Sequence, residues 1–148
     1  MTGPPTTHVA SKEELLELVV DEVLGEVWIP GEFTADRWRA DMLATSRSLR
    51  DTLLRHTWLG GVMSSAGLVY LGPDVMRMIE GILAILETAG FDDIVSDPAS
   101  NAIFSYVMGS SSSEAALLTA AARSGLSEQE WVDRILVLSR AVPAVPAD

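Results

Sequence analysis

The sequence contains a series of helix start and stop signals, and no run in which apolar and polar residues alternate as they do in a half-buried strand. Two Ser-x-x-Glu capping boxes lie at Ser11–Glu14 and Ser127–Glu130. Pro73 is suited to a first helical position, and Gly90 and Gly125 are suited to the position after a helix end. Apolar side chains recur at steps of three and four between these signals. We therefore predict an all-α fold, an irregular helical bundle.

Five longer helices are predicted between these signals, over about 12–24, 35–56, 73–89, 98–123 and 128–141. Thr34 or Asp36 is expected to cap the second helix, and Pro98 is expected to begin the fourth. A short helical turn and a loop are expected within 57–70, where glycines interrupt an apolar run. The last helix is expected to bury its apolar side chains, at Trp131, Ile135, Leu136 and Leu138.

The composition narrows the classes of function that the chain can have. Among 148 residues, 21 are Asp or Glu and 10 are Lys or Arg, which gives a formal net charge of −11. This balance argues against binding to nucleic-acid phosphates or to an anionic membrane surface, because both attract Lys and Arg. The chain has no Cys and two His, so we expect no disulfide and no metal site. It also contains neither a P-loop nor a GxGxxG motif, so we expect no cofactor. No leader segment and no run of about 18 apolar residues is visible, so a cytoplasmic location is expected.

Several segments, taken in order, resemble the C-terminal ligand-binding domain of TetR-family transcriptional repressors. They are His8–Leu16, Asp21–Glu26, Trp38–Arg39, Leu49–Arg50, Leu53–His56, Trp58–Leu59, Leu71–Pro73, Glu80, Leu83, Leu86, Ala89–Phe91 and Tyr106–Gly109, followed by Glu114. Each segment is short, but their order and spacing together extend the resemblance over about residues 8–140. The helix-turn-helix unit of such repressors is represented here by at most His8 to Ala10. We therefore expect this chain not to bind DNA by itself.

The resemblance implies a pocket for a hydrophobic, aromatic or polycyclic small molecule between the second, third and fourth long helices. It implies a flexible N-terminal remnant over 1–10, a helical ligand-binding domain over 11–141 and a Pro/Ala tail over 142–148. It also suggests a homodimer formed through the fourth long helix. From the periodicity of each helix, the expected ligand-binding residues are Trp38, Met42, Thr45, Ser46, Leu49, His56, Trp58, Met76, Ile79, Glu80, Leu83, Asn101, Phe104, Ser105 and Met108.

Two other functions remain open from the residues alone. The same pocket could serve a cofactor-independent enzyme, such as a cyclase, isomerase or dehydratase, with His56, Glu80 or Tyr106 as the acid or base. His56 could instead simply finish its helix, and a buried Glu80 could instead pair with Arg50 or Arg39. A third possibility is a subunit that pairs with a full-length repressor and weakens its binding to DNA.

Overall fold

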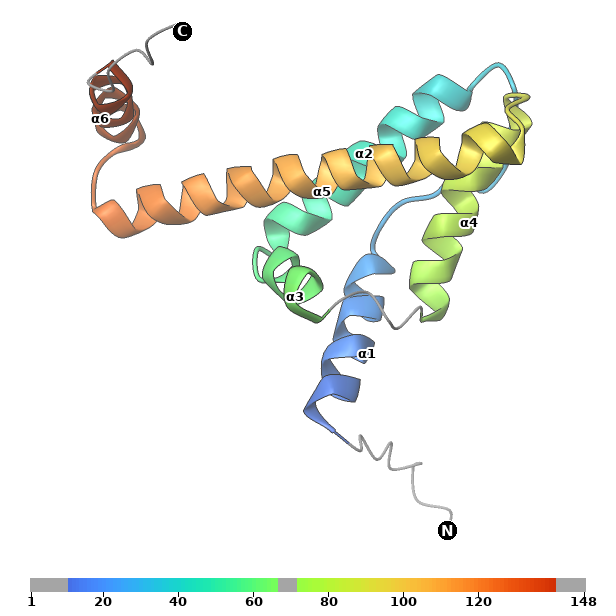
Figure 1. Ribbon diagram of the computed structural model, residues 1–148, viewed down its shortest axis with the longest axis horizontal. Helices are drawn as coiled ribbons and strands as arrows, with labels where there is room; N and C mark the ends of the chain where they lie inside the picture. Colours follow the sequence, from blue (N-terminus) through green and yellow to red (C-terminus); the bar gives the residue numbers. More distant parts are fainter. Residues whose placement is uncertain (1–10, 67–71, 141–148) are drawn as a thin grey trace, which may run out of the picture. The chain divides into compact units, whose positions relative to one another are not determined.

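A computed structural model describes residues 11–66 and 72–140, and every regular element in these ranges is a helix (Figure 1). The six helices are α1 (Lys12–Leu24), α2 (Trp38–Arg55), α3 (Leu59–Ala66), α4 (Pro73–Thr88), α5 (Asp93–Ser124) and α6 (Glu128–Arg140). The prediction of an all-α fold is therefore confirmed. Within the described ranges, no helix is both long and apolar enough to cross a membrane. The tails predicted over 1–10 and 142–148 lie outside the described residues.

Most of the helix ends that the sequence predicts are formed by the expected contacts. The Ser11 hydroxyl accepts a hydrogen bond from the Glu14 amide at 3.1 Å, and Pro73 occupies the first turn of α4. Gly90 follows α4 with φ of 92°, a left-handed conformation that favours glycine. At α6, the Ser127 amide and hydroxyl both donate to the Glu130 carboxylate, at 2.9 and 2.7 Å. These bonds, the hydroxyl first, lower the pKa of Glu130 below its ordinary value.

Two predicted helix starts are wrong. The segment before α2 forms a separate turn, in which the Arg37 amide donates to the Thr34 carbonyl at 3.2 Å, so α2 begins at Trp38 without a side-chain cap. Helix α5 begins at Asp93 rather than at Pro98, because the Asp92 carboxylate accepts from the Val95 amide at 3.1 Å. Pro98 lies inside this helix, where its missing N–H removes one hydrogen bond.

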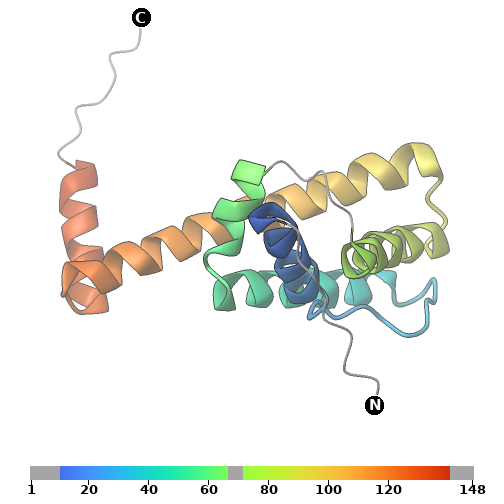
Figure 2. The ribbon, with the colours of Figure 1, turned by 90° about the horizontal axis from the view of Figure 1, so that it is seen from below.

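The described chain divides into two compact units, one extending to Ser112 and one starting at Ser113, both of which include part of α5. In the first unit, α1, α2 and α4 pack against one another, and Figure 2 shows α1 in front of α2. Residues from all five helices of this unit form one apolar core, which is made of Val23, Leu24, Val27, Met42, Leu49, Leu53, Leu59, Met63, Val75, Met78, Ile82, Ile85, Leu86 and Val107. The domain boundaries predicted from the sequence stay a prediction.

The second unit contains the end of α5 and all of α6, and it buries little apolar surface. Only Trp131 is half-buried among the α6 side chains that were expected in a core. The expectation that the others are buried is wrong, because they and their neighbours are exposed: Val132, Ile135, Leu136, Val137 and Leu138. The end of α5 and α6 together form a unit that is too small to cover both faces of α6.

Candidate functional site

A cavity of about 320 Å³ lies within the first unit, among α1, α3, α4 and α5. Its described lining is Leu24, Met63, Val75, Met78, Ile79, Ile82, Ser100, Asn101, Phe104 and Ser105. The walls from α1, α3 and α4 are entirely apolar, whereas α5 contributes three polar side chains beside Phe104. A volume near the lower end of the range for ligand pockets, with apolar walls and a few placed polar groups, suits a small organic molecule.

The carboxylate of Asp21 fixes the start of α4, which supplies four of these lining residues. Asp21 belongs to α1 and is 6 % exposed. Its Oδ1 accepts hydrogen bonds from the amides of Asp74 and Val75, at 3.1 and 2.9 Å. The carboxylate therefore caps a helix that is more than fifty residues away in the sequence. A side chain at Gly72 would collide with the same carboxylate, so the close approach of α1 to α4 requires glycine there.

A second contact joins the same two helices in the opposite direction. The guanidinium of Arg77, on α4, donates to the carbonyl oxygens of Gly25 and Val27, at 2.9 and 3.4 Å. Gly25 is the residue after the end of α1, where free carbonyl groups gather. Each helix thus caps an end of the other, and Leu24 and Val75 are held on neighbouring walls of the cavity.

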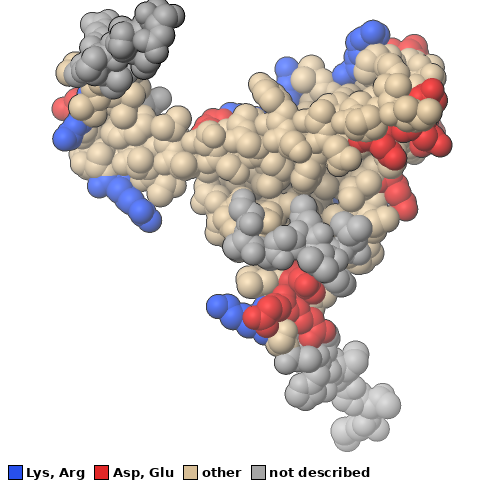
Figure 3. Space-filling view, in the orientation of Figure 1, with Lys and Arg blue, Asp and Glu red and all other residues tan. Residues whose placement is uncertain are grey.

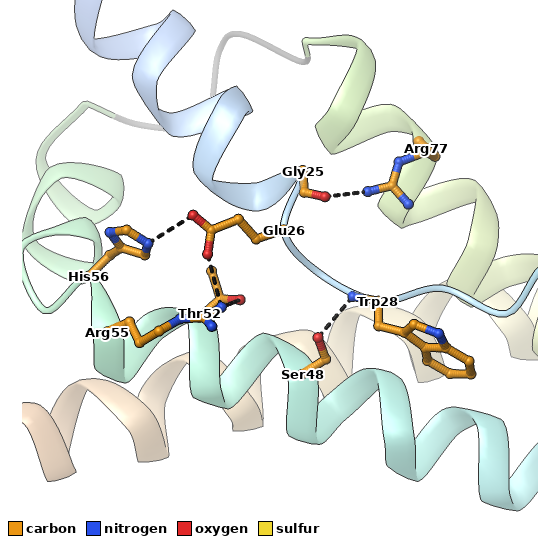
Figure 4. A network of polar contacts seen from close by, with 8 residues as sticks. All are labelled: Gly25, Glu26, Trp28, Ser48, Thr52, Arg55, His56 and Arg77. Carbon is orange, nitrogen blue, oxygen red and sulfur yellow. Dashed lines mark hydrogen bonds and ion pairs between the residues drawn. The ribbon is translucent and has the colours of Figure 1, made fainter.

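The loop after α1 is attached to α2 by polar contacts (Figure 4). The carboxylate of Glu26 contacts Nε2 of His56 at 3.0 Å and Nη2 of Arg55 at 2.9 Å. Further along, the Trp28 amide donates to the Ser48 hydroxyl at 2.8 Å. His56 is the residue directly after α2, its ring contacts this carboxylate, and it is not among the described residues that line the cavity. The geometry favours the structural interpretation of His56, a side chain that completes a helix end.

Four of the residues predicted to bind ligand line the cavity: Ile79, Asn101, Phe104 and Ser105. On α5 the predicted face agrees closely with the lining. On α4 the predicted face is displaced by one residue. Met76, Glu80 and Leu83 were expected to line the cavity. The residues that do so are Val75, Met78 and Ile82, together with Ile79. Successive residues of an α-helix are about 100° apart around its axis, so an error of one residue in the predicted face points that face away from the cavity. Glu80 is exposed, so the expectation that its carboxylate is buried is wrong.

Helix α2 contributes no residue to the described lining, although the sequence indicated that it would form one wall. Met42, Thr45 and Leu49 are buried in the interior, whereas Ser46 is half-buried. Trp38 is also half-buried, and its ring meets that of Phe91 edge to face at a centroid distance of 5.3 Å. Thr45 is 1 % exposed, and its hydroxyl has no hydrogen-bond partner among the described residues.

The remaining predicted residues lie outside the cavity lining. Trp58 is exposed and packs its ring against His56, at a centroid distance of 6.2 Å. Tyr106 is 77 % exposed on α5, and Met108 is half-buried against the core. Sequence reasoning missed Leu24, Met63 and Ser100, which also line the cavity. The helix predicted over about 12–24 placed Leu24 at its end, but no local pattern showed what that end faces.

A helical unit that encloses an apolar cavity with a few polar groups has the architecture of a ligand-binding domain. The chain belongs to the family of tetracyclin repressor-like C-terminal domains, whose model matches residues 30–147.

Relatives of this chain include transcriptional regulators and a TetR family protein solved in complex with actinorhodin. It is 37 % identical over 107 residues to an HTH-type transcriptional regulator of Saccharopolyspora erythraea, an alignment that covers 72 % of this chain and 44 % of that protein. It is 31 % identical over 134 residues to the HTH-type transcriptional repressor DrrR1 of Streptomyces coeruleorubidus, covering 90 % and 49 %. The Streptomyces coelicolor TetR family protein ActR in complex with actinorhodin has a TM-score of 0.70 and 27 % identity, covering 92 % and 61 %. The chain thus spans about half the length of the curated relatives it matches.

Proposed function

We propose that this chain is a sensing or carrying domain that binds a hydrophobic, aromatic or polycyclic small molecule in the cavity between α1, α3, α4 and α5. The observation that supports this most directly is the lining itself, where six apolar side chains face an edge of neutral polar groups. The complex of ActR with actinorhodin is consistent with the proposal, because it shows a related fold holding a small molecule. The absence of direct DNA binding and the cytoplasmic location stay predictions.

A fluorescence titration tests the proposal. N-phenyl-1-naphthylamine is an uncharged aromatic probe whose emission rises in apolar surroundings. We expect saturable binding with one site per chain and a dissociation constant in the micromolar range, because the cavity can exclude water from much of the probe. Mass spectrometry of molecules extracted from the purified protein then identifies a natural ligand. A linear, non-saturating titration would contradict the proposal.

The cavity gives less support to an enzyme. None of the described lining residues carries an acid or a base, and His56, Glu80 and Tyr106 all lie outside the lining. A group that transfers a proton has to lie within hydrogen-bond reach of the reacting atom, directly or through one water. The described site therefore favours binding of an unchanged molecule over its conversion.

We also propose a homodimer formed through α5. Ile94 is 85 % exposed and Tyr106 is 77 % exposed, both unusual for large apolar or aromatic side chains. Ala102 and Gly109, one turn before Tyr106 and one turn after it, are small and allow a second helix to approach. Figure 3 shows that acidic side chains gather at α1 and near the start of α5, while much of the visible α5 surface carries no charge.

Light scattering during size-exclusion chromatography measures this association. We expect a mass of about twice the 15.9 kDa of one chain. Tyr106→Arg is expected to shift the equilibrium toward one chain, because it places a charge in the interface. Arg47→Glu, an exposed change on α2, is the control. A mass of one chain at all accessible concentrations would exclude the homodimer.

A further inference from the structure

The chemistry of the cavity walls restricts the kind of ligand that fits, provided that the cavity binds one as proposed above. All of its described hydrogen-bonding side chains belong to a single helix, α5. Ser100 and Asn101 lie on one turn and Ser105 on the next, with Phe104 between them. The opposite walls offer only the side chains of leucine, methionine, valine and isoleucine. A ligand therefore meets polar groups along one edge and apolar surface elsewhere.

The polar edge can both accept and donate hydrogen bonds. The Ser100 hydroxyl donates its proton to the Asp97 carbonyl at 2.9 Å, so toward the cavity it is left to accept. The side chains of Asn101 and Ser105 make no hydrogen bond to any described residue, and each can donate and accept. Asn101 and Ser105 are four residues apart, which places them about 6 Å apart along the helix axis. The edge is thus suited to hydroxyl or carbonyl groups with a similar spacing.

Among the residues that the structure describes at the cavity, no charged side chain could pair with a charged ligand. The lining contains no Lys, Arg, His, Asp or Glu in its described part. The amides of Asp74 and Val75 could otherwise attract an anion, but the Asp21 carboxylate already occupies them. Arg77 is the one cation of α4, and its guanidinium donates to the carbonyl groups at the end of α1. Moving an ion from water into such surroundings is costly.

We infer that the ligand is an uncharged molecule with an apolar body and hydroxyl or carbonyl groups along one edge. The body fills the space between α1, α3 and α4, and the polar edge lies against Ser100, Asn101 and Ser105. Because Asn101 and Ser105 are themselves exposed, the polar edge lies at the mouth of the cavity and the apolar body enters first.

Three probes with one ring system test this inference: phenanthrene, 9-phenanthrol and phenanthrene-9-carboxylate. Binding is measured by fluorescence at pH 7 in about 0.5 M salt, which screens the net negative charge of the chain. We expect 9-phenanthrol to bind about 5-fold more tightly than phenanthrene, because its hydroxyl bonds to the α5 edge. We expect the carboxylate to bind about 10-fold more weakly than 9-phenanthrol, because no described lining residue pairs with its charge and the exposed edge at Asn101 and Ser105 hydrates it only in part.

Variants of α5 show whether the edge is responsible. Asn101→Leu is expected to remove the preference for 9-phenanthrol while phenanthrene still binds. Ser110→Ala is the control, since Ser110 lies on the same helix outside the described lining. The inference is overturned if phenanthrene and 9-phenanthrol bind equally, or if the carboxylate binds as tightly as 9-phenanthrol. Either result leaves the proposed function of the cavity intact. If none of the three probes binds, the cavity proposal fails, and the inference fails with it.

Discussion

Replacing Asp21 with alanine is expected to lower the free energy of unfolding by about 3 kcal/mol. The change removes the acceptor for two amides at the start of α4, and unsatisfied buried donors cost about 1–3 kcal/mol each. Asp21→Asn keeps an oxygen in the same place, so its expected cost is smaller, about 1 kcal/mol. Urea denaturation followed by circular dichroism measures both values. Equal, small losses in the two variants would show that the cap contributes little.

Gly72→Ala provides an independent test of the same contact. Its new methyl group would meet the Asp21 carboxylate, so we expect a loss of about 2 kcal/mol in the native sequence. In an Asp21→Ala background the space is free, and the same change is expected to cost less than about 0.5 kcal/mol. A double-mutant cycle therefore yields a coupling of about 1.5 kcal/mol. Additive losses would contradict the close approach of Gly72 to Asp21.

Ser105→Trp is expected to weaken binding of N-phenyl-1-naphthylamine by about 30-fold or more. Ser105 lies on the exposed side of the cavity lining, so an indole there occupies space that the probe needs. The thermal midpoint is expected to change little, since the substituted side chain is exposed and makes no hydrogen bond to a described residue. Binding is measured by the same fluorescence titration in the native sequence and the variant.

Ser110→Trp is the matched control for this experiment. It adds the same ring to the same helix, at an exposed position outside the described cavity lining. Its probe affinity is expected to stay within about 3-fold of that of the native sequence. If both tryptophan variants weaken binding equally, the probe occupies another part of the molecule.

Helix ends were predictable where a single residue type determines the backbone conformation. Gly90 follows α4 in a left-handed conformation, with its amide bonded to Glu87 and the amide of Phe91 bonded to Leu86, at 2.9 and 3.2 Å. The start of α5 was less predictable because two start signals lie close together. Asp92 caps the helix, and the proline that resembled a start is tolerated inside it.

The cavity was harder to predict, because its walls depend on how the helices are rotated. On α4, apolar residues occupy both the expected face and the face one residue earlier, so periodicity alone cannot select between them. The choice is made by a contact between distant parts of the chain, in which Asp21 holds the first turn of α4. No pattern within α4 contains that information. Leu24 and Met63 were not predicted for the same reason, because their neighbours in the cavity come from other helices.

The mutual capping of α1 and α4 has a consequence for local opening of the fold. When the last turn of α1 frays, Arg77 loses its carbonyl partners, and when the first turn of α4 frays, Asp21 loses its amide partners. Each helix end is thus stable only while the other is intact, so the two open together in one cooperative event. Hydrogen exchange at these two ends, which are about fifty residues apart in the chain, should therefore report a single opening free energy.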